Sequence, residues 1–383
     1  MPVDVASFPS TPRIPSRAIC ESRVVPQPDV DQSEFVKQLR RFMQERGHDM
    51  LVPTDDCMLR AVVDNYDEFA DLVHIGCPPP AIARGVLDKT ATLAVAQRCG
   101  IRTPRTALVS RSSELHDLVG SFSFPWILKP AQKETRVEEL KSCKLASVDE
   151  IATRFPLERG FTPPMLVQEY CAGTGVGVEM LLDHGECVAV FQHRRLKELP
   201  YTGGFSVIAV AEAPDPSLIE SSLALLQAMQ WDGIAMVEYK VNSDGQAVLM
   251  EVNGRYWGTI ALAISAGIDF PLYDWQLVHG ERPEIPRGYA VGTKWRWTVG
   301  YLHRLYDLLD LARGSTTARE VLCQDLRELV EDFGPSVSDP MVRLSDPMPS
   351  VVALLYAMRD FASYTATRAA NLYRSLALRL DVR

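Results

Sequence analysis

The sequence of 383 residues lacks several patterns that mark common classes of protein. Its eight cysteines form no CxxC pair and no histidine lies at zinc-finger spacing from them, which excludes a zinc site of that kind. No apolar run reaches the ~18 residues that a membrane-spanning helix needs. No basic segment followed by an apolar one opens the chain, so we expect no signal peptide. Together these absences predict a soluble, cytoplasmic protein with free thiols.

The chain also lacks an excess of basic residues. Its formal net charge is −9 and its pI is about 5.4, so we expect no nucleic acid among its partners. Hydrophobic residues make up 46% of the chain, which indicates a globular protein. The length is sufficient for two or three domains with well-buried cores.

Strand and helix signals alternate in the first part of the chain. The segment 3–7 predicts a short strand, and 31–47 predicts a helix that ends at Gly47. Two further strands are predicted at 49–56 and at 72–80, where prolines stop the second one. Such alternation is typical of a parallel α/β layer.

The rest of the chain predicts a helix, a series of strands and a helical end. The helix ends at Gly100, and a Ser/Pro-rich break at 335–350 interrupts the helical end. The predicted elements are a helix and extended segment at 88–109, a strand at 124–131, successive strands from "PMLVQEYCAG" to "HRRLKE" with a turn at His184-Gly185, and a hairpin at 233–255.

An apolar stripe at helical spacing occupies the C-terminal segment. It consists of Val351, Leu354, Leu355, Met358, Phe361, Leu372, Leu376 and Leu380. Basic residues accompany its last turns at Arg368, Arg374, Arg379 and Arg383. The stripe predicts core packing or a contact with a second copy of the chain, and a loose hold on an anionic membrane surface is the alternative.

The hairpin at 233–255 brings charged residues together. Asp244-Gly245 is a strong signal for a two-residue loop. With that loop Glu238 lies opposite Glu251, and one face becomes wholly apolar through the pairs Val237–Val252, Tyr239–Met250 and Val241–Val248. The other face carries Glu238, Glu251, Asn253 and Arg255.

Two carboxylates directly opposed across strands destabilise a sheet, and a bound cation reverses that effect. Two carboxylates with the amide oxygen of Asn253 suit Mg²⁺ that is shared with phosphate oxygens. The alternative is a solvated outer face on which Lys240 softens the repulsion. A three-residue loop would turn one strand over and remove the pairing.

Further motifs occur along the chain in a fixed order. "DKT" contains Lys89, and "WILKP" contains Lys129 at a strand end where Pro130 fixes the backbone, so that its cation is presented rigidly to a phosphate. "LVQEY" and "GVGVEM" contain Glu169 and Glu179, and "AMVEYK" and "LMEVNGR" form the hairpin. Each lysine or glutamate taken singly is equally consistent with an ordinary solvated residue.

Taken together, these motifs make the span from about 86 to 285 resemble the ATP-grasp superfamily, most of all its carboxylate–amine ligase and carbamoyl-phosphate-synthase-like members. The resemblance implies an α/β ATP-grasp fold, in which two α+β lobes grip ATP. It also implies a truncated Rossmann-like pre-ATP-grasp domain before this fold and a helical segment after it. The expected domains are 1–85, 86–300 and 301–383.

The resemblance also implies roles for individual residues. Lys89 and Lys129 match the basic residues that hold the ATP phosphates, and Glu179 matches the position that contacts the ribose. The hinge strand meets the adenine through its backbone and an acid, and it carries Gln168, Glu169 and Tyr170. The hairpin supplies Glu238, Glu251 and Asn253 as ligands of Mg²⁺, with Mn²⁺ as an alternative ion, and Arg255 as the catalytic arginine.

A basic cluster follows a predicted strand in "FQHRRLKELPYTGG", 191–204. In the resemblance this place reaches the acyl-phosphate or the carboxylate. Arg195 and Lys197 are therefore expected to stabilise developing negative charge, whereas His193 is a weaker candidate. The alternative is a basic surface loop that balances an acidic protein.

The sequence departs from the family pattern in two places. The segment "PAQKETRVEELKSCKLAS", 130–147, has no glycine where the family has a glycine-rich loop that closes over the triphosphate. Lys133 or Arg136 is expected to cover the phosphates instead. At the N-terminus, "VDVAS" resembles the second strand of the family's first domain, so the first strand and helix are expected to be missing.

The resemblance implies an ADP-forming ligase, of the carboxylate–amine (C–N) type, that uses ATP and Mg²⁺. A substrate carboxylate attacks the γ-phosphorus, and an amine then attacks the resulting acyl-phosphate. The expected partners are small carboxylates and amines, and a homodimer is one expected assembly. One alternative is a nucleotide-binding regulator or degenerate scaffold without turnover, and another is phosphate transfer to an acceptor without ligation.

Overall fold

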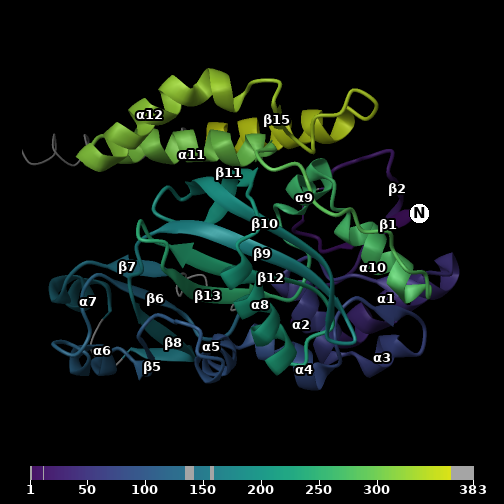
Figure 1. Ribbon diagram of the computed structural model, residues 1–383, viewed down its shortest axis with the longest axis horizontal. Helices are drawn as coiled ribbons and strands as arrows, with labels where there is room; N and C mark the ends of the chain where they lie inside the picture. Colours follow the sequence, from purple (N-terminus) through teal and green to yellow (C-terminus); the bar gives the residue numbers. More distant parts are fainter. Residues whose placement is uncertain (1, 12, 134–141, 156–158, 364–383) are drawn as a thin grey trace, which may run out of the picture. The chain divides into compact units, whose positions relative to one another are not determined.

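The structure is a computed structural model, and it describes residues 2–11, 13–133, 142–155 and 159–363 (Figure 1). Contacts along the chain divide it into two compact units. The first unit comprises Met1–Phe35, Arg195–Val210 and Thr293–Arg383, and the second comprises Val36–Arg194 and Ala211–Gly292. The predicted division into 1–85, 86–300 and 301–383 stays a prediction.

The second unit begins with a small α/β layer. Its elements are α1 (Gln32–Arg46), which starts in the first unit, β3 (Met50–Leu51), α2 (Asp56–Asp64), α3 (Asp67–Ala70), β4 (His74–Ile75) and α4 (Pro80–Leu87). Strands β3 and β4 pair in parallel, as the alternation of signals predicts. The side chain of Asp55 accepts a hydrogen bond from the Met58 amide and so caps α2, which places Asp56 in the first turn.

A four-stranded antiparallel sheet follows in the order β5-β8-β6-β7. Its strands are β5 (Thr106–Arg111), β6 (Trp126–Pro130), β7 (Cys143–Leu145) and β8 (Gly160–Glu169), accompanied by α6 (Ser113–Asp117) and α7 (Val148–Arg154). Trp126 and Leu128 point into a buried core with Val167 of β8. Because side chains alternate along a strand, Lys129 points to the opposite face.

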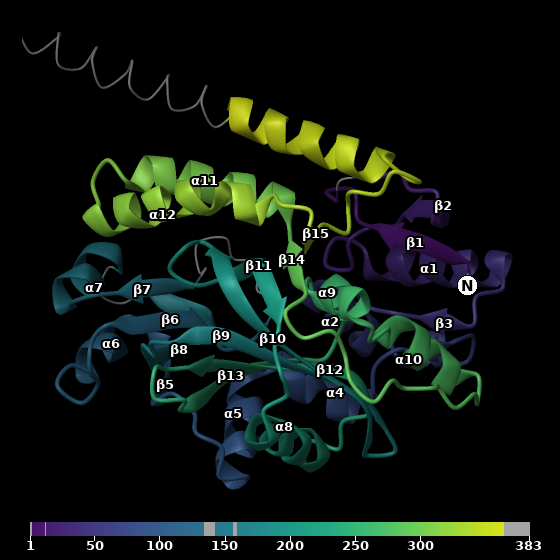
Figure 2. The same ribbon diagram turned by 45° about the horizontal axis from the view of Figure 1, so that its top comes forward.

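A group of four neighbouring strands, part of a larger sheet, has the order β13-β12-β9-β10. Its strands are β9 (Thr174–Asp183), β10 (Glu186–Leu199), β12 (Gly233–Val241) and β13 (Ala247–Asn253). Helices α4, α5 (Lys89–Arg98) and α8 (Pro216–Ala228) contact this sheet (Figure 2). The unit also contains α9 (Ile260–Ala266) and α10 (Phe270–Val278).

The β12–β13 hairpin confirms the predicted pairing of Glu238 with Glu251. The predicted two-residue loop is wrong, because strand pairing ends at Val241 and Ala247 and residues 242–246 form the loop. A loop of this length shifts the register by one residue relative to the predicted one. Taken alone, that shift would have separated the two carboxylates.

A β-bulge at Met250 restores the register. Tyr239 pairs with Leu249, whereas Glu238 pairs with Glu251, so Met250 is the extra residue. The predicted pairs Tyr239–Met250 and Val241–Val248 are therefore wrong. Leu249 replaces Met250 on the apolar face, where it is fully buried with Tyr239.

The first unit contains short strands and a helical pair. Its elements are β1 (Val3–Ser7), β2 (Ile19–Val24), β11 (Phe205–Ala211), β14 (Lys294–Arg296), β15 (Val337–Ser338), α11 (Thr298–Leu311) and α12 (Thr316–Asp332). Strands β1 and β2 pair in parallel, and β14 lies between β11 and β15. Tyr301 of α11 packs against Val207 and Ile208 of β11 in a buried cluster.

Residues 348–363 are helical, as predicted, but core packing of the apolar stripe is wrong within the described residues. Its members there are exposed: Val351, Leu354, Leu355, Met358 and Phe361. The other stripe residues and the basic residues lie outside the described part of the chain: Leu372, Leu376, Leu380, Arg368, Arg374, Arg379 and Arg383. No helix in the described part of the chain is both long and apolar enough to span a membrane.

Candidate active site

One face of the β13-β12-β9-β10 sheet collects the acidic residues of the predicted motifs. Glu238 lies opposite Glu251, and Met236 lies opposite both Asn253 and Glu179. Directly opposed residues of neighbouring strands point to the same side of a sheet, so these four polar side chains share a face. The structure therefore brings together the predicted metal ligands and the predicted ribose contact.

Asn253 is fixed by neighbours on both sides of its amide. It is 2% exposed, and its Nδ2 donates to Glu238 Oε1 at 2.7 Å. Its Oδ1 accepts from Lys133 Nζ at 2.7 Å and from Arg255 Nη2 at 3.4 Å. In this arrangement Asn253 turns its amide nitrogen, and not its oxygen, toward Glu238.

Lys89 and Lys129 lie close to these acids. Lys89 opens α5, where Asp88 caps the helix by accepting from the amides of Thr90 and Ala91. Its Nζ donates to the carbonyl of Pro130, the residue after Lys129, at 2.9 Å. Burial lowers the pKa of Lys89 to about 8, although the negative charge of Glu251 acts to raise it. Burial also lowers the pKa of Lys129.

Lys133, one of the two residues expected to cover the phosphates, is enclosed by other parts of the chain. It is 5% exposed, and its Nζ donates to the Val252 carbonyl at 2.8 Å as well as to Asn253. Its backbone N–H donates to the Leu87 carbonyl at 2.8 Å, and its own carbonyl accepts from Arg60 Nη2 at 2.8 Å. Because hydrogen bonds hold both its backbone and its ammonium, Lys133 is a fixed part of the site. Arg136, the other residue expected there, lies outside the described residues.

Glu251 is ionised in this environment. Burial would raise the pKa of its carboxyl, but the nearby cations Lys133, Lys129 and Lys89, with Arg255, outweigh it and lower the pKa to about 2. Lys133 Nζ lies 3.8 Å from Glu251 Oε2. A carboxylate that stays charged at neutral pH is the form that binds a metal ion.

Arg255 contacts an acid that the sequence did not single out. Its Nη2 donates to Asp56 Oδ2 at 3.0 Å, and its Nη1 donates to the Tyr256 carbonyl at 3.0 Å. The other oxygen of Asp56 is buried and lies 3.9 Å from Lys133 Nζ, and the described residues offer it no hydrogen bond. The sequence signal for Asp56 was its place at the end of the segment predicted at 49–56, because loops at strand ends tend to carry functional residues.

Glu179 forms a buried pair with His193. Both side chains are fully buried, and His193 Nδ1 lies 2.6 Å from Glu179 Oε1. Burial raises the pKa of Glu179, and His193 opposes that shift. Glu179 Oε2 and His193 Nε2 have no hydrogen-bond partner among the described residues. Gly177 makes the pair possible, because a Cβ at 177 would lie 2.4 Å from His193 Cε1.

The hinge residues point in different directions. Gln168 is opposite Ile127 in β6, on the face that also carries Lys129, whereas Glu169 is opposite Trp126 on the other face. Glu169 Oε1 accepts from the Ser123 amide at 2.8 Å. Tyr170 is 39% exposed, and Lys144 Nζ lies 3.9 Å from the centre of its ring. The Gln168 side chain thus shares the face of Lys129, and so does Lys144, the residue that contacts Tyr170 and lies opposite Ile127.

Arg195 and Lys197 contact residues of the first unit. Arg195 Nη1 donates to the Gly204 carbonyl at 2.9 Å and lies 3.4 Å from Glu198 Oε1. The Lys197 ammonium is 7% exposed and contacts three carboxylates of α12, namely Asp325 at 3.2 Å, Glu328 at 2.9 Å and Asp332 at 2.5 Å. These contacts are those of an ion-pair network, whereas the resemblance implies a catalytic cation at Lys197.

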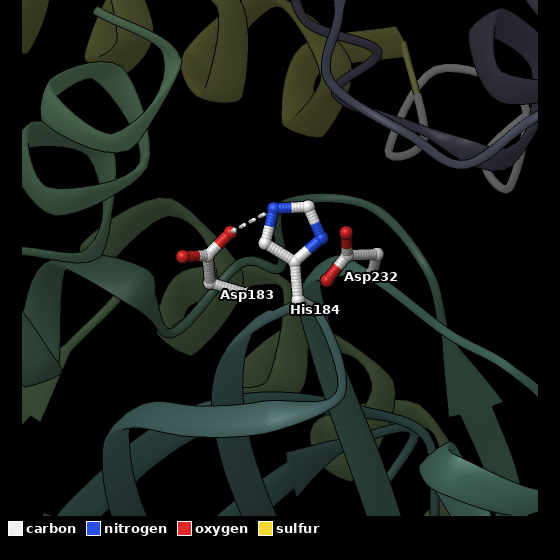
Figure 3. A group of neighbouring side chains, drawn as sticks. All are labelled: Asp183, His184 and Asp232. Carbon is white, nitrogen blue, oxygen red and sulfur yellow. Dashed lines mark ion pairs between the residues drawn. The ribbon is translucent and has the colours of Figure 1, made fainter. Parts of the chain in front are cut away.

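A separate group of possible metal ligands lies at the end of β9. Asp183, His184 and Asp232 come together there, and His184 lies between the two carboxylates (Figure 3). The His184 side chain is 91% exposed and lies 3.8 Å from Asp183. Asp183 is four residues beyond Glu179 on the same strand, about 13 Å at the usual rise. This exposed group is therefore distinct from the face that carries Glu238 and Glu251.

Comparisons with known proteins agree with this geometry. Residues 161–298 match the family described as "ATP-grasp in the biosynthetic pathway with Ter operon". A protein of Streptomyces coelicolor named "Putative D-alanine--D-lactate ligase" is 25% identical over 206 residues. That match covers 49% of this chain and 56% of the relative, so this chain spans about half the length of that curated protein.

Solved structures share the fold at low sequence identity. An L-amino acid ligase from Bacillus licheniformis has a TM-score of 0.51 and 16% identity, with 68% of this chain and 63% of that chain covered. The biotin carboxylase domain of the Hydrogenobacter thermophilus 2-oxoglutarate carboxylase, a dimer with MgADP and bicarbonate, has a TM-score of 0.58 and 12% identity, with coverages of 73% and 64%. The expected α/β ATP-grasp fold is thus confirmed.

Proposed function

We propose that this chain with an ATP-grasp fold is an ADP-forming ligase that joins a carboxylate to an amine. The pairing of Glu238 with Glu251 carries the proposal, because it concentrates two acids on one face. Four cations surround Glu251: Lys89, Lys129, Lys133 and Arg255. Opposed carboxylates among cations fit a nucleotide triphosphate with its metal better than they fit a solvated sheet surface.

The donor set fits Mg²⁺ or Mn²⁺ at the two carboxylates. Glu251 stays ionised at neutral pH, and both acids provide the hard oxygen ligands that these ions prefer. Asn253 is a poorer ligand for the ion in its present orientation, because its amide nitrogen faces Glu238. When bound, the ion would supply positive charge that offsets the charge of the ATP phosphates.

The chain's own cations would stabilise the negative charge that the metal ion does not offset. We assign Lys89 and Lys129 to the ATP phosphates, which their fixed positions near Glu251 support. A substrate carboxylate attacks the γ-phosphorus, ADP leaves, and an amine then displaces phosphate from the acyl-phosphate. Arg255 would stabilise the negative charge that develops on the acyl group, because its guanidinium offers two parallel donors.

The other predicted contacts stay proposals. Gln168 lies on the same face of its sheet as Lys129, which supports it as a nucleotide contact. Glu179 lies on the same face as Glu238, which supports it as the ribose contact. Arg195 remains a candidate for stabilising the acyl group. The three carboxylates around Lys197 favour a structural role instead.

The substrates would be a small carboxylic acid and an amine. The names of the relatives, a D-alanine–D-lactate ligase and an L-amino acid ligase, support amino acids or hydroxy acids as the first compounds to try. The exposed apolar side chains of 348–363 support a homodimer. The eight cysteines, all free, support a location in the cytoplasm.

Phosphate release from ATP with Mg²⁺ tests the proposal. Pools of carboxylic acids and amines would be screened with the unchanged protein, with Glu251→Gln, and with Glu186→Gln, which alters an exposed acid at the start of β10. We expect release that needs both an acid and an amine and that Glu251→Gln abolishes, while Glu186→Gln leaves it intact. Nucleotide binding without release in any pool would instead support a regulator.

A further inference from the structure

We propose that the ammonium of Lys133 is a built-in cation that takes the place of a metal ion at Asn253. The active face would then hold a single divalent ion, at Glu238 and Glu251. This inference rests on the proposed function only in taking these two acids as the metal ligands. It concerns the number of ions bound and not the reaction that follows.

Oxygen atoms of two elements, β13 and α2, converge on Lys133 Nζ. Asn253 Oδ1 lies at 2.7 Å and the Val252 carbonyl oxygen at 2.8 Å, both from the β13 strand. Glu251 Oε2 lies at 3.8 Å, and Asp56 Oδ1 of α2 lies at 3.9 Å. An amide oxygen, a carbonyl and two carboxylates form the kind of hard oxygen set that usually surrounds a divalent cation.

The placement of this ammonium is fixed by its backbone. The Lys133 N–H donates to the Leu87 carbonyl, and the Lys133 carbonyl accepts from Arg60. The side chain is 5% exposed, so its ordered contacts are shielded from water. Since hydrogen bonds fix both the backbone and the side chain of Lys133, its positive charge stays at the same place in the site.

The orientation of Asn253 follows from this cation. With Oδ1 occupied by Lys133, the amide nitrogen is left to donate to Glu238. A metal ion at Asn253 would need that oxygen, and it would lie next to an ammonium of like charge. An ion at Glu238 and Glu251 would instead be held by their carboxylates and would not need the Asn253 oxygen.

Counting bound Mn²⁺ tests the proposal directly. The unchanged protein, saturated with a non-hydrolysable ATP analogue, would be titrated with Mn²⁺ and the bound ion measured by electron paramagnetic resonance. We expect one protein-bound Mn²⁺ per nucleotide complex. We expect a second one in Lys133→Met, which removes the charge but keeps much of the side-chain volume. Two ions in the unchanged protein would overturn the proposal, whatever the variants do.

Thermal stability gives an independent measure without nucleotide or turnover. Lys133→Met removes the ammonium that contacts Asn253 Oδ1 and lies near Glu251 and Asp56. Added Mg²⁺ should therefore raise the Tm of this variant by several degrees more than it raises that of the unchanged protein. Lys133→Arg, which keeps the charge, and Lys37→Met, at an exposed position of α1, should respond like the unchanged protein. Equal Mg²⁺-dependent shifts in all four proteins would contradict the proposal.

A milder variant covers the case in which Lys133→Met does not fold. Lys133→Gln keeps an N–H donor for Asn253 but carries no charge, and it should also gain a second Mn²⁺. Failure of the proposed ligase reaction would leave these ion counts unchanged. If the number of bound Mn²⁺ ions differed from the expected number, the prediction for phosphate release would still stand. The two proposals can therefore be rejected separately.

Discussion

Glu238 and Glu251 face each other across the β12–β13 hairpin because a five-residue loop and a one-residue bulge offset each other. The loop at 242–246 shifts the register by one residue, and the bulge at Met250 shifts it back. Two opposed carboxylates are costly without a cation, so a bulge that preserves their pairing indicates a functional constraint. The predictions below examine the groups that surround this pair.

Nucleotide affinity should fall at alkaline pH through Lys89. Its pKa in the free protein is lowered to about 8, chiefly by burial, and bound phosphate would raise it again. Above pH 8 the free protein must therefore take up a proton to bind, and the Kd of a non-hydrolysable ATP analogue should rise by up to about tenfold per pH unit. Calorimetric titrations between about pH 7 and 9.5 measure this effect. A flat profile would contradict the assignment, and Lys89→Arg should flatten it.

Asp56→Ala should lower kcat by about 10- to 100-fold with little change in the KM for ATP. The substitution removes a charge-assisted hydrogen bond that holds Arg255 Nη2 at 3.0 Å, and such bonds contribute about 1.5–3 kcal/mol. Asp56→Asn keeps an acceptor oxygen and should restore part of the loss. An unchanged or higher kcat in Asp56→Ala would show that Asp56 blocks Arg255 and does not orient it.

Lys197→Met should destabilise the protein by about 3 kcal/mol, because it removes the cation that contacts three carboxylates of α12, of which Asp325 keeps a second partner in Arg304. Urea unfolding monitored by circular dichroism measures the change. Lys37→Met, at an exposed position, serves as the control and should stay within about 0.5 kcal/mol of the unchanged protein. If Lys197→Met were equally stable but inactive, the catalytic role predicted from the sequence would be restored.

Gly177→Ala should weaken nucleotide binding and cost about 1–3 kcal/mol of stability. The new Cβ would lie 2.4 Å from His193 Cε1, so the His193–Glu179 pair must shift. Gly160→Ala is a matched control in β8, because no atom lies within 4 Å of its Cβ position. Equal affinity for the ATP analogue in both variants would argue against Glu179 as a nucleotide contact.

The sequence by itself determined the order of the motifs and much of the local structure. Lys129 before Pro130, the cap at Asp88 before Lys89, and the alternating acids of "EVNGR" depend on neighbours a few residues away. Such local patterns specify strands, helix starts and the side of a strand that a residue occupies. They were sufficient to predict the face that carries Glu238 and Glu251, whereas the ATP-grasp fold was expected from the resemblance that the ordered motifs carry.

Only the tertiary structure decided which charged groups meet. Asp56 reaches Arg255 across 199 positions of sequence, and Lys133 reaches Asn253 across 120. No local pattern encodes such contacts, because they depend on how separate elements pack. Burial has the same origin: Lys133 and Lys197 both look like exposed lysines in the sequence, yet each is enclosed by acceptors in the fold. A charge becomes part of a site or of a structural network according to what packing places around it.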